Sequence, residues 1–217
     1  MMPALRALLL LILLSVVAGC ARLPALPEEP ADEQAWAERR VVLAALEHWQ
    51  VEGRVAVMAG DEGWSASLRW EQDGEFMDFL IRGPMGTGTT RIQGDANWMV
   101  VEDSSGDRWG SRDPAAELEA RTGWRVPLTK LRWWMLGLPD PGVDAQTDVD
   151  GAGRLVRLRQ AGWTIHYDRY EEREGVILPG RINVESEDVR VRIVARDWQL
   201  FASPPGVLPD DQGREAP

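Results

Sequence analysis

Residues 64–70 read WSASLRW, so that an apolar side chain stands at every second position. A period of two is typical of a β-strand with one buried face and one wet face. The same alternation recurs in three other stretches, residues 51–57, 163–167 and 189–193. Short joints with hairpin chemistry occur at residues 60–63, 73–74 and 161–162. These patterns predict an antiparallel sheet with one covered face.

Three helices are expected besides the strands. The first spans residues 32–47 and places Trp36 on its apolar face. The second spans residues 113–122, where Asp113 and Pro114 supply a cap and a first-turn proline. The third spans residues 127–137 and carries an apolar stripe that ends at a glycine. About ten strands with these helices predict a curled sheet covered on its open side by helices.

The only cysteine, Cys20, follows a stretch with the composition of a secretory signal. Arg6 precedes an apolar run at residues 8–17, and two small residues stand just before the cysteine. The run is too short to span a bilayer, which needs about 20 residues. Residues 17–20, VAGC, also resemble the bacterial lipobox, in which cleavage leaves an acylated cysteine at the start of the mature chain. The alternative is ordinary cleavage that leaves a free thiol.

The chain is expected to have four parts. They are a lipoprotein signal peptide at residues 1–19, an acylated cysteine with a proline-rich tether at 20–31, the folded domain at 32–200, and a disordered tail at 201–217. Position 21 is alanine. Bacterial lipoproteins kept in the inner membrane commonly carry aspartate there, so the resemblance implies the outer membrane.

The charge of the chain limits its partners. After position 19 there are 23 basic and 35 acidic residues, a formal charge of −12. So acidic a surface repels nucleic acid and anionic headgroups, and acyl chains must therefore hold the protein at a membrane. Eleven tryptophans against three phenylalanines and two tyrosines favour a wide apolar interior or a lipid-contacting surface.

Residues suited to catalysis are few. His48 and His166 have no cysteine partner and no clustered carboxylates, so neither a metal site nor a cofactor is expected. A Gly-x-Ser-x-Gly elbow is absent from the sequence, and residues 83–88 are glycine-rich but lack the lysine of a phosphate-binding loop. The sequence therefore does not predict an enzyme.

The most informative local feature is the run Gly83, Pro84, Met85 and Gly86. It follows a strand rich in apolar residues at 76–81, so the turn should project at the rim of the sheet. A methionine between proline and glycine cannot bury itself by local packing, and its unbranched thioether adapts to irregular apolar partners. The alternative is a methionine that folds back onto the core.

This run is one of several segments that resemble the outer-membrane lipoprotein receptor family LolB. The others are residues 126–139 (VPLTKLRWWMLGLP), 162–167 and 178–179. The likeness extends from about Trp49 to Trp198. In that family the residue between the proline and glycine of the rim loop is usually an exposed leucine that promotes insertion of lipid, and Met85 matches that position.

The resemblance implies an incomplete antiparallel β-barrel of about 10–11 strands that encloses an apolar cavity, with the helices as its lid. It further implies a receptor in the outer membrane of a Gram-negative bacterium, anchored through N-palmitoyl and S-diacylglycerol groups on Cys20 and facing the periplasm. Such a receptor accepts triacylated lipoproteins from a LolA-like carrier. It inserts them into the inner leaflet without nucleotide hydrolysis, and we expect it to act as a monomer.

Seven apolar residues are expected to line the cavity, from the strand alternation and the helix stripe: Trp70, Leu80, Trp98, Trp134, Leu138, Trp163 and Ile165. Each could instead be a simple core residue. Two other classes of function also remain open at this point. One is a lipid-anchored binding module for another hydrophobic ligand. The other is a non-catalytic envelope scaffold or inhibitor lipoprotein, which would have a filled core.

Overall fold

The computed structural model describes residues 30–84, 88–113, 116, 119 and 127–202. The described residues from Ala31 onward belong to one compact unit. Several predictions concern residues outside these ranges: the signal peptide, Cys20, most of the tether, Met85, Gly86 and most of the tail.

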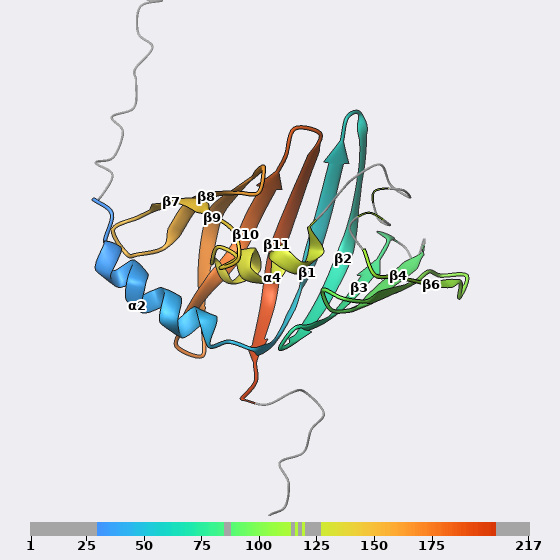
Figure 1. The fold of residues 1–217 in the computed structure, drawn as a ribbon, viewed down its shortest axis with the longest axis horizontal. Coiled ribbons are helices and arrows are strands. Elements are labelled where there is room, and N and C mark those ends of the chain that lie inside the picture. Colours follow the sequence, from blue (N-terminus) through green and yellow to red (C-terminus); the bar gives the residue numbers. More distant parts are fainter. Residues whose placement is uncertain (1–29, 85–87, 114–115, 117–118, 120–126, 203–217) are drawn as a thin grey trace, which may run out of the picture. The chain divides into compact units, whose positions relative to one another are not determined.

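Eleven strands form a single antiparallel sheet in the order β6-β5-β4-β3-β2-β1-β11-β10-β9-β8-β7. Their bounds are β1 His48–Ala59, β2 Glu62–Asp73, β3 Phe76–Arg82, β4 Thr89–Gly94, β5 Met99–Glu102, β6 Arg108–Ser111, β7 Ala145–Val149, β8 Leu155–Gln160, β9 Trp163–Arg173, β10 Val176–Glu185 and β11 Val189–Leu200. The sheet curls but stays open, since β6 and β7 stand at its two ends (Figure 1). This confirms the predicted mostly β fold with an unclosed antiparallel sheet.

The first and last strands join the two halves of the sheet. β1 pairs with β11 along its length, and every other pairing is between strands that follow each other in sequence. A bulge interrupts this ladder, because Glu52 pairs with Asp197 and Gly53 pairs with Ala195, which leaves Arg196 as the extra residue. A Cβ atom on Gly53 would lie 2.1 Å from the carbonyl oxygen of Val194, so only glycine fits there.

Helix α2 (Glu33–Ala44) packs at the β7–β10 end of the sheet (Figure 1). It begins where the sequence predicts, since Asp32 Oδ1 accepts a hydrogen bond of 2.9 Å from the N–H of Ala35. It ends at Ala44, three residues before the predicted end, because β1 already begins at His48. Arg39 fastens the helix to the sheet, where it donates to the carbonyl of Ile177 and lies 5.3 Å from the ring centre of Tyr170.

Helix α4 (Leu128–Leu136) lies across the concave face of the sheet, over β10 and β11 (Figure 1). It follows Pro127 as predicted and ends at Gly137, whose φ of 78° is the left-handed conformation that closes many helices. Of the predicted helix at residues 113–122, Ala116 and Glu119 are helical. Asp113 Oδ1 accepts a 3.0 Å hydrogen bond from the N–H of Ala116, while the other residues of this helix lie outside the described ranges.

Candidate functional site

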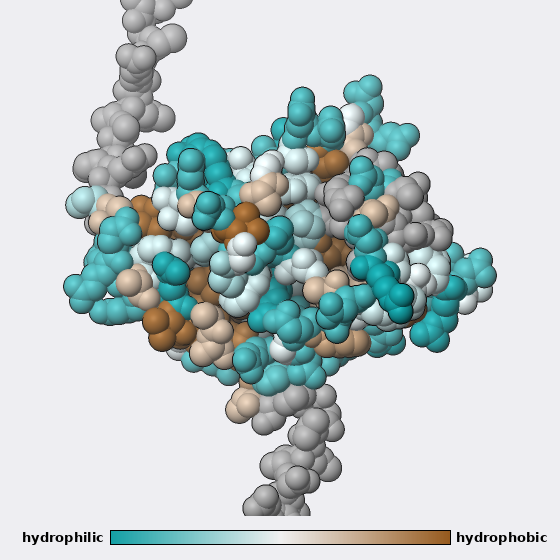
Figure 2. Space-filling model, viewed as in Figure 1, coloured by the Kyte–Doolittle hydropathy of each residue, from teal (hydrophilic) through white to brown (hydrophobic). Residues whose placement is uncertain are grey.

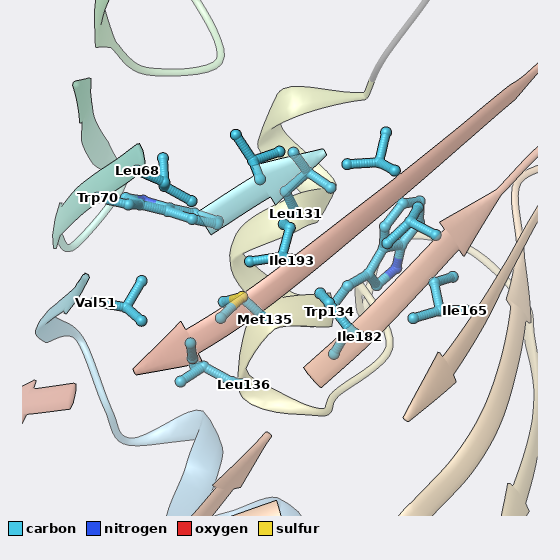
Figure 3. Close-up of a cluster of buried hydrophobic side chains, with 14 of the residues drawn as sticks. Val51, Leu68, Trp70, Leu131, Trp134, Met135, Leu136, Ile165, Ile182 and Ile193 are labelled. Carbon is cyan, nitrogen blue, oxygen red and sulfur yellow. The ribbon is translucent and has the colours of Figure 1, made fainter. Parts of the chain in front are cut away.

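The space between α4 and the concave face of the sheet is apolar (Figure 3). Helix α4 contributes Leu131, Trp134 and Met135, which are all buried. The sheet contributes one or more apolar residues from each of five strands, Val51, Leu68, Trp70, Ile165, Ile182 and Ile193. This interior belongs to one continuous apolar cluster that joins both halves of the sheet.

Aromatic rings form much of the interior wall. The ring of Trp49 lies 4.9 Å from that of Trp70 and 5.3 Å from that of Trp198. Trp70 in turn lies 4.3 Å from Phe79, so the chain of rings crosses four neighbouring strands. Such rings bury large apolar areas, and these four are all buried.

A buried glutamine fixes the C-terminal end of α4. Gln160 on β8 is 3% exposed, and its Oε1 accepts hydrogen bonds of 2.9 Å from Trp134 Nε1 and from the N–H of Asp140. Its Nε2 donates to the carbonyls of Asp140 and Val143 at 2.8 and 2.7 Å. Tyr167 adds a hydrogen bond of 3.0 Å from its hydroxyl to the carbonyl of Trp134. The amide is therefore fully satisfied, as a buried polar group must be.

Charged contacts hold α4 as well. Lys130 Nζ donates to Asp140 Oδ2 at 2.7 Å. Arg132 is 9% exposed, donates to the carbonyl of Gly74 at 2.8 Å, and pairs with Glu75 in the turn between β2 and β3. Arg132 thus ties the helix to the β2–β3 half of the sheet, and Gln160 ties it to β8 in the other half, so α4 forms a fixed wall of the interior.

The ion pair between Lys130 and Asp140 makes the stability of the fold depend on pH. Burial alone would raise the pKa of Asp140, but hydrogen bonds from Lys130 and from the N–H of Gly142 outweigh it and lower the pKa below its ordinary value of 3.8. A carboxyl with a lowered pKa stabilises the fold above that ordinary value, and the contribution disappears as the pH falls through the lowered pKa.

We therefore expect Asp140→Asn to lower the free energy of unfolding by at most about 1 kcal/mol at pH 7, because the pair is partly solvated. The difference between the variant and the native protein should shrink steadily below pH 3.8. Denaturant unfolding at a series of pH values measures it. A difference that grows as the pH falls would contradict the assignment.

Five of the seven predicted cavity residues lie in the interior, namely Trp70, Trp134, Leu138, Trp163 and Ile165. Whether they line a cavity for a ligand stays a prediction. Sequence reasoning missed Leu131 and Met135, although both fall on the same helical stripe as Trp134. It also missed Phe79, whose ring packs against Trp70.

Leu80 is a correction, because it lies on the opposite face of the sheet. Phe79 pairs with the inward-facing Trp70, and neighbouring residues of a strand point to opposite faces. Leu80 therefore points outward, where Arg69 and Arg91 are its direct cross-strand neighbours. The strand is apolar at nearly every position, so alternation could not assign its faces.

Trp98 is also a correction. It is 48% exposed, and its ring lies over Gly110 on the outer face. Asp95 sets this geometry, since its Oδ1 accepts from the N–H groups of Asn97 and Trp98 and so forms the turn that precedes β5. The next residue, Met99, points inward instead and is 1% exposed.

The predicted rim loop begins directly after β3. Arg82 pairs with Thr89, and the N–H of Gly83 then donates to the carbonyl of Gly88 at 2.9 Å. This bond closes the base of the loop at the end of the sheet that also carries the β1–β2 turn. The projection of Met85 stays a prediction, because Met85 lies outside the described residues.

The surface around the interior is mainly hydrophilic. On the side that carries α4, apolar residues form small separate groups (Figure 2). The larger exposed apolar residues include Trp64, which is 43% exposed near the β1–β2 turn. Within the described ranges, no group of three or more metal-ligating side chains comes together. None of the helices described there combines the length and the apolar character needed to cross a membrane.

The family model "Outer membrane lipoprotein LolB" matches residues 47–198. The chain is 36% identical over 202 residues to the outer-membrane lipoprotein LolB of Stutzerimonas stutzeri, a match that covers 91% of this chain and 97% of that protein. It is also 36% identical over 188 residues to the protein of the same name from Pseudomonas aeruginosa, with 86% of this chain and 92% of that protein covered.

Two solved structures share the fold at low sequence identity. A LolA superfamily protein from Nitrosomonas europaea is 12% identical with a TM-score of 0.52, and the match covers 83% of this chain and 96% of that one. A DUF1329 family protein from Desulfovibrio piger is 10% identical with a TM-score of 0.50, covering 80% and 94%. Both likenesses concern the fold alone.

Proposed function

The chain belongs to the LolB family of outer-membrane lipoproteins, and on that basis we propose that it accepts triacylated lipoproteins from a periplasmic carrier and inserts them into the inner leaflet of the outer membrane. Cys20 would carry the anchoring acyl chains, and the protein would act as a monomer. The observation that carries the proposal is the apolar interior between α4 and the open sheet.

This interior supplies what a cargo acyl chain needs. A chain of about 16 carbons exposed to water costs roughly 13 kcal/mol, at about 0.8 kcal/mol per CH₂. Passage through the aqueous periplasm therefore requires a host at every step. We place the acyl chains against five buried residues of this interior. Trp70, Trp163 and Ile165 lie on the sheet, Trp134 lies on α4, and Leu138 follows α4.

Loading would require interior side chains to move aside. Met77, Met99 and Met135 are each 1% exposed and belong to the same apolar cluster as the aromatic rings. Their unbranched thioether side chains adapt to irregular neighbours more easily than branched ones do. The methionines would therefore repack around the incoming chains while the hydrogen bonds of Gln160 keep α4 in place.

Differences in affinity would drive transfer, since the proposal includes no catalytic step. The acyl chains would move from the carrier to this receptor and then to the bilayer, each a better apolar host than the last. Met85 would act last, when the loop of Gly83, Pro84, Met85 and Gly86 enters the leaflet and lets the cargo reach lipid without meeting water.

The test follows a labelled lipoprotein from a loaded carrier to the acylated receptor and then to liposomes. We expect Met85→Glu to preserve uptake but to slow delivery about tenfold or more, because a carboxylate enters lipid at a cost of several kcal/mol. Met85→Leu is the matched control and should deliver at the native rate. If Met85→Glu also delivers at the native rate, the role of Met85 is wrong.

The same apolar interior would suit a module that binds some other hydrophobic ligand. Such a module would bind a fluorescent fatty acid but would not take lipoproteins from the carrier. Binding of the fatty acid without any carrier-to-receptor transfer would therefore favour this second function over the first.

A further inference from the structure

A row of arginines crosses the outer face of the sheet, opposite the apolar interior. Ser67 on β2 pairs with Arg82 on β3 and with Arg54 on β1. Val194 on β11 pairs with Arg54 and with Arg181 on β10. The three arginines thus share one register line on alternate strands, about 10 Å apart. All three side chains are exposed.

These arginines differ from their neighbours in lacking acidic partners. Other arginines of this face pair with carboxylates, as in Arg91 with Asp78, Arg169 with Glu171 and Arg190 with Glu185. Among the described residues, no ion pair involves Arg54, Arg82, Arg181 or Arg196. A hollow beside the row is bordered by Arg69, Arg82 and Arg196 together with Glu52 and Asp197, so three positive charges stand there against two negative ones.

The fold does not explain the row. Arg181 is paired with Arg169 on β9, and Arg169 already has Glu171 as its partner, so β9 offers Arg181 no countercharge at this position. Toward the β1–β2 turn the next positions on β1 and β2 are Ala56 and Ser65, which offer no countercharge. In a mature chain with a formal charge of −12, unpaired arginines aligned on one face indicate an anionic partner.

We propose that this row, Arg54, Arg82 and Arg181, binds the phosphate groups of lipid headgroups in the leaflet that anchors the protein. The guanidinium group binds phosphate through two parallel hydrogen bonds, which favours arginine for this contact. The lipid anchor keeps headgroups at high effective concentration near the domain, so weak individual contacts add up. The acidic residues of the chain are repelled by anionic lipid, whereas the unpaired arginines of the row attract it, so we expect the row to turn toward the membrane.

The row also adjoins the predicted insertion loop, because Arg82 directly precedes Gly83. Headgroup contact through the row would bring that loop to the leaflet surface. The inference goes beyond the proposed function, since the row would bind headgroups with or without cargo and whether or not Met85 enters lipid.

The natural chain has one cysteine, Cys20, so an introduced cysteine can be labelled selectively in the acylated protein. A fluorophore on Ser67→Cys, between Arg54 and Arg82, reports the distance to headgroups in phosphatidylglycerol vesicles that contain a headgroup spin label. We expect strong quenching in the native background. Each arginine near an anionic surface is expected to favour the membrane-facing orientation about fivefold. Replacing Arg54, Arg82 and Arg181 with glutamine should therefore lower the membrane-facing population about 100-fold and abolish the quenching.

Two controls separate the row from charge in general. Replacing Arg108, Arg112 and Arg159 with glutamine changes the net charge equally outside the row, and should leave quenching intact. A fluorophore on Gln146→Cys of the edge strand β7 should be quenched little in either background. At about 1 M salt the Debye length is about 3 Å, so the native protein should lose its quenching without any substitution. This measurement tests the row even if the glutamine variant does not fold.

Equal quenching in the native protein and the row variant would overturn the inference, and so would quenching that survives high salt. Uptake of cargo from the carrier is measured on the same proteins. If the row variant loses quenching but takes up cargo normally, the result supports headgroup binding by the row and leaves the receptor function intact. Absent uptake with normal quenching contradicts the receptor function but supports the row.

Discussion

Replacing Trp134 with alanine is expected to lower the free energy of unfolding by about 3–5 kcal/mol, the usual cost of removing a buried aromatic side chain. The residue is fully buried in the last turn of α4, and its ring lies 6.3 Å from that of Trp163. The substitution leaves a cavity between the helix and the sheet. It also removes the indole N–H that donates to Gln160 at 2.9 Å. Denaturant unfolding followed by circular dichroism measures the loss.

The matched control is Trp64→Ala, which removes the same side chain from a position that is 43% exposed. We expect that variant to cost about 1 kcal/mol or less, because little burial is lost. If Trp134→Ala proves no more costly than Trp64→Ala, then α4 is not packed on the sheet as described.

Gly53→Ala is expected to cost about 3 kcal/mol or more, although it adds a single methyl group. Its Cβ would lie 2.1 Å from the carbonyl oxygen of Val194, well inside van der Waals contact. The obstructing atom belongs to the backbone of β11, so the two strands must separate to admit it. This is also the bulge in the one ladder that joins the two halves of the sheet.

Thermal unfolding and amide hydrogen exchange check this prediction, with the fastest exchange expected in β1 and β11. Gly142→Ala serves as the control, because the nearest atom to its Cβ would be Asp140 Oδ1 at 3.4 Å. That variant should stay within about 0.5 kcal/mol of the native protein. Similar stabilities for the two alanine variants would mean that β1 and β11 do not approach so closely.

Local patterns predicted the elements of this fold well. Residues 64–70 alternate strictly, and their inward positions Ala66, Leu68 and Trp70 are buried as the period of two requires. The turn at Ala161 and Gly162 has positive φ at both residues, the conformation of the tight hairpin that the sequence indicates. Helix α4 was predicted because proline, an apolar stripe and glycine mark its start, face and end.

Patterns failed where local sequence does not determine the direction of a side chain. Residues 76–81 are apolar at most positions, so only the pairing of β3 with β2 reveals that Phe79 faces in and Leu80 faces out. Trp98 was misplaced for a similar reason, since the turn formed by Asp95 decides its face. The arginine row could not be predicted either, because it depends on the register of β1 against β11, which are far apart in sequence.

The two edge strands of the sheet, β6 and β7, affect how easily the sheet can change its curvature. A closed barrel has a circumference fixed by its strand number and shear, and it can enlarge only by breaking hydrogen bonds between strands. Here β6 and β7 are not bonded to each other. The sheet can therefore change its curvature while the hydrogen bonds between all of its paired strands stay intact.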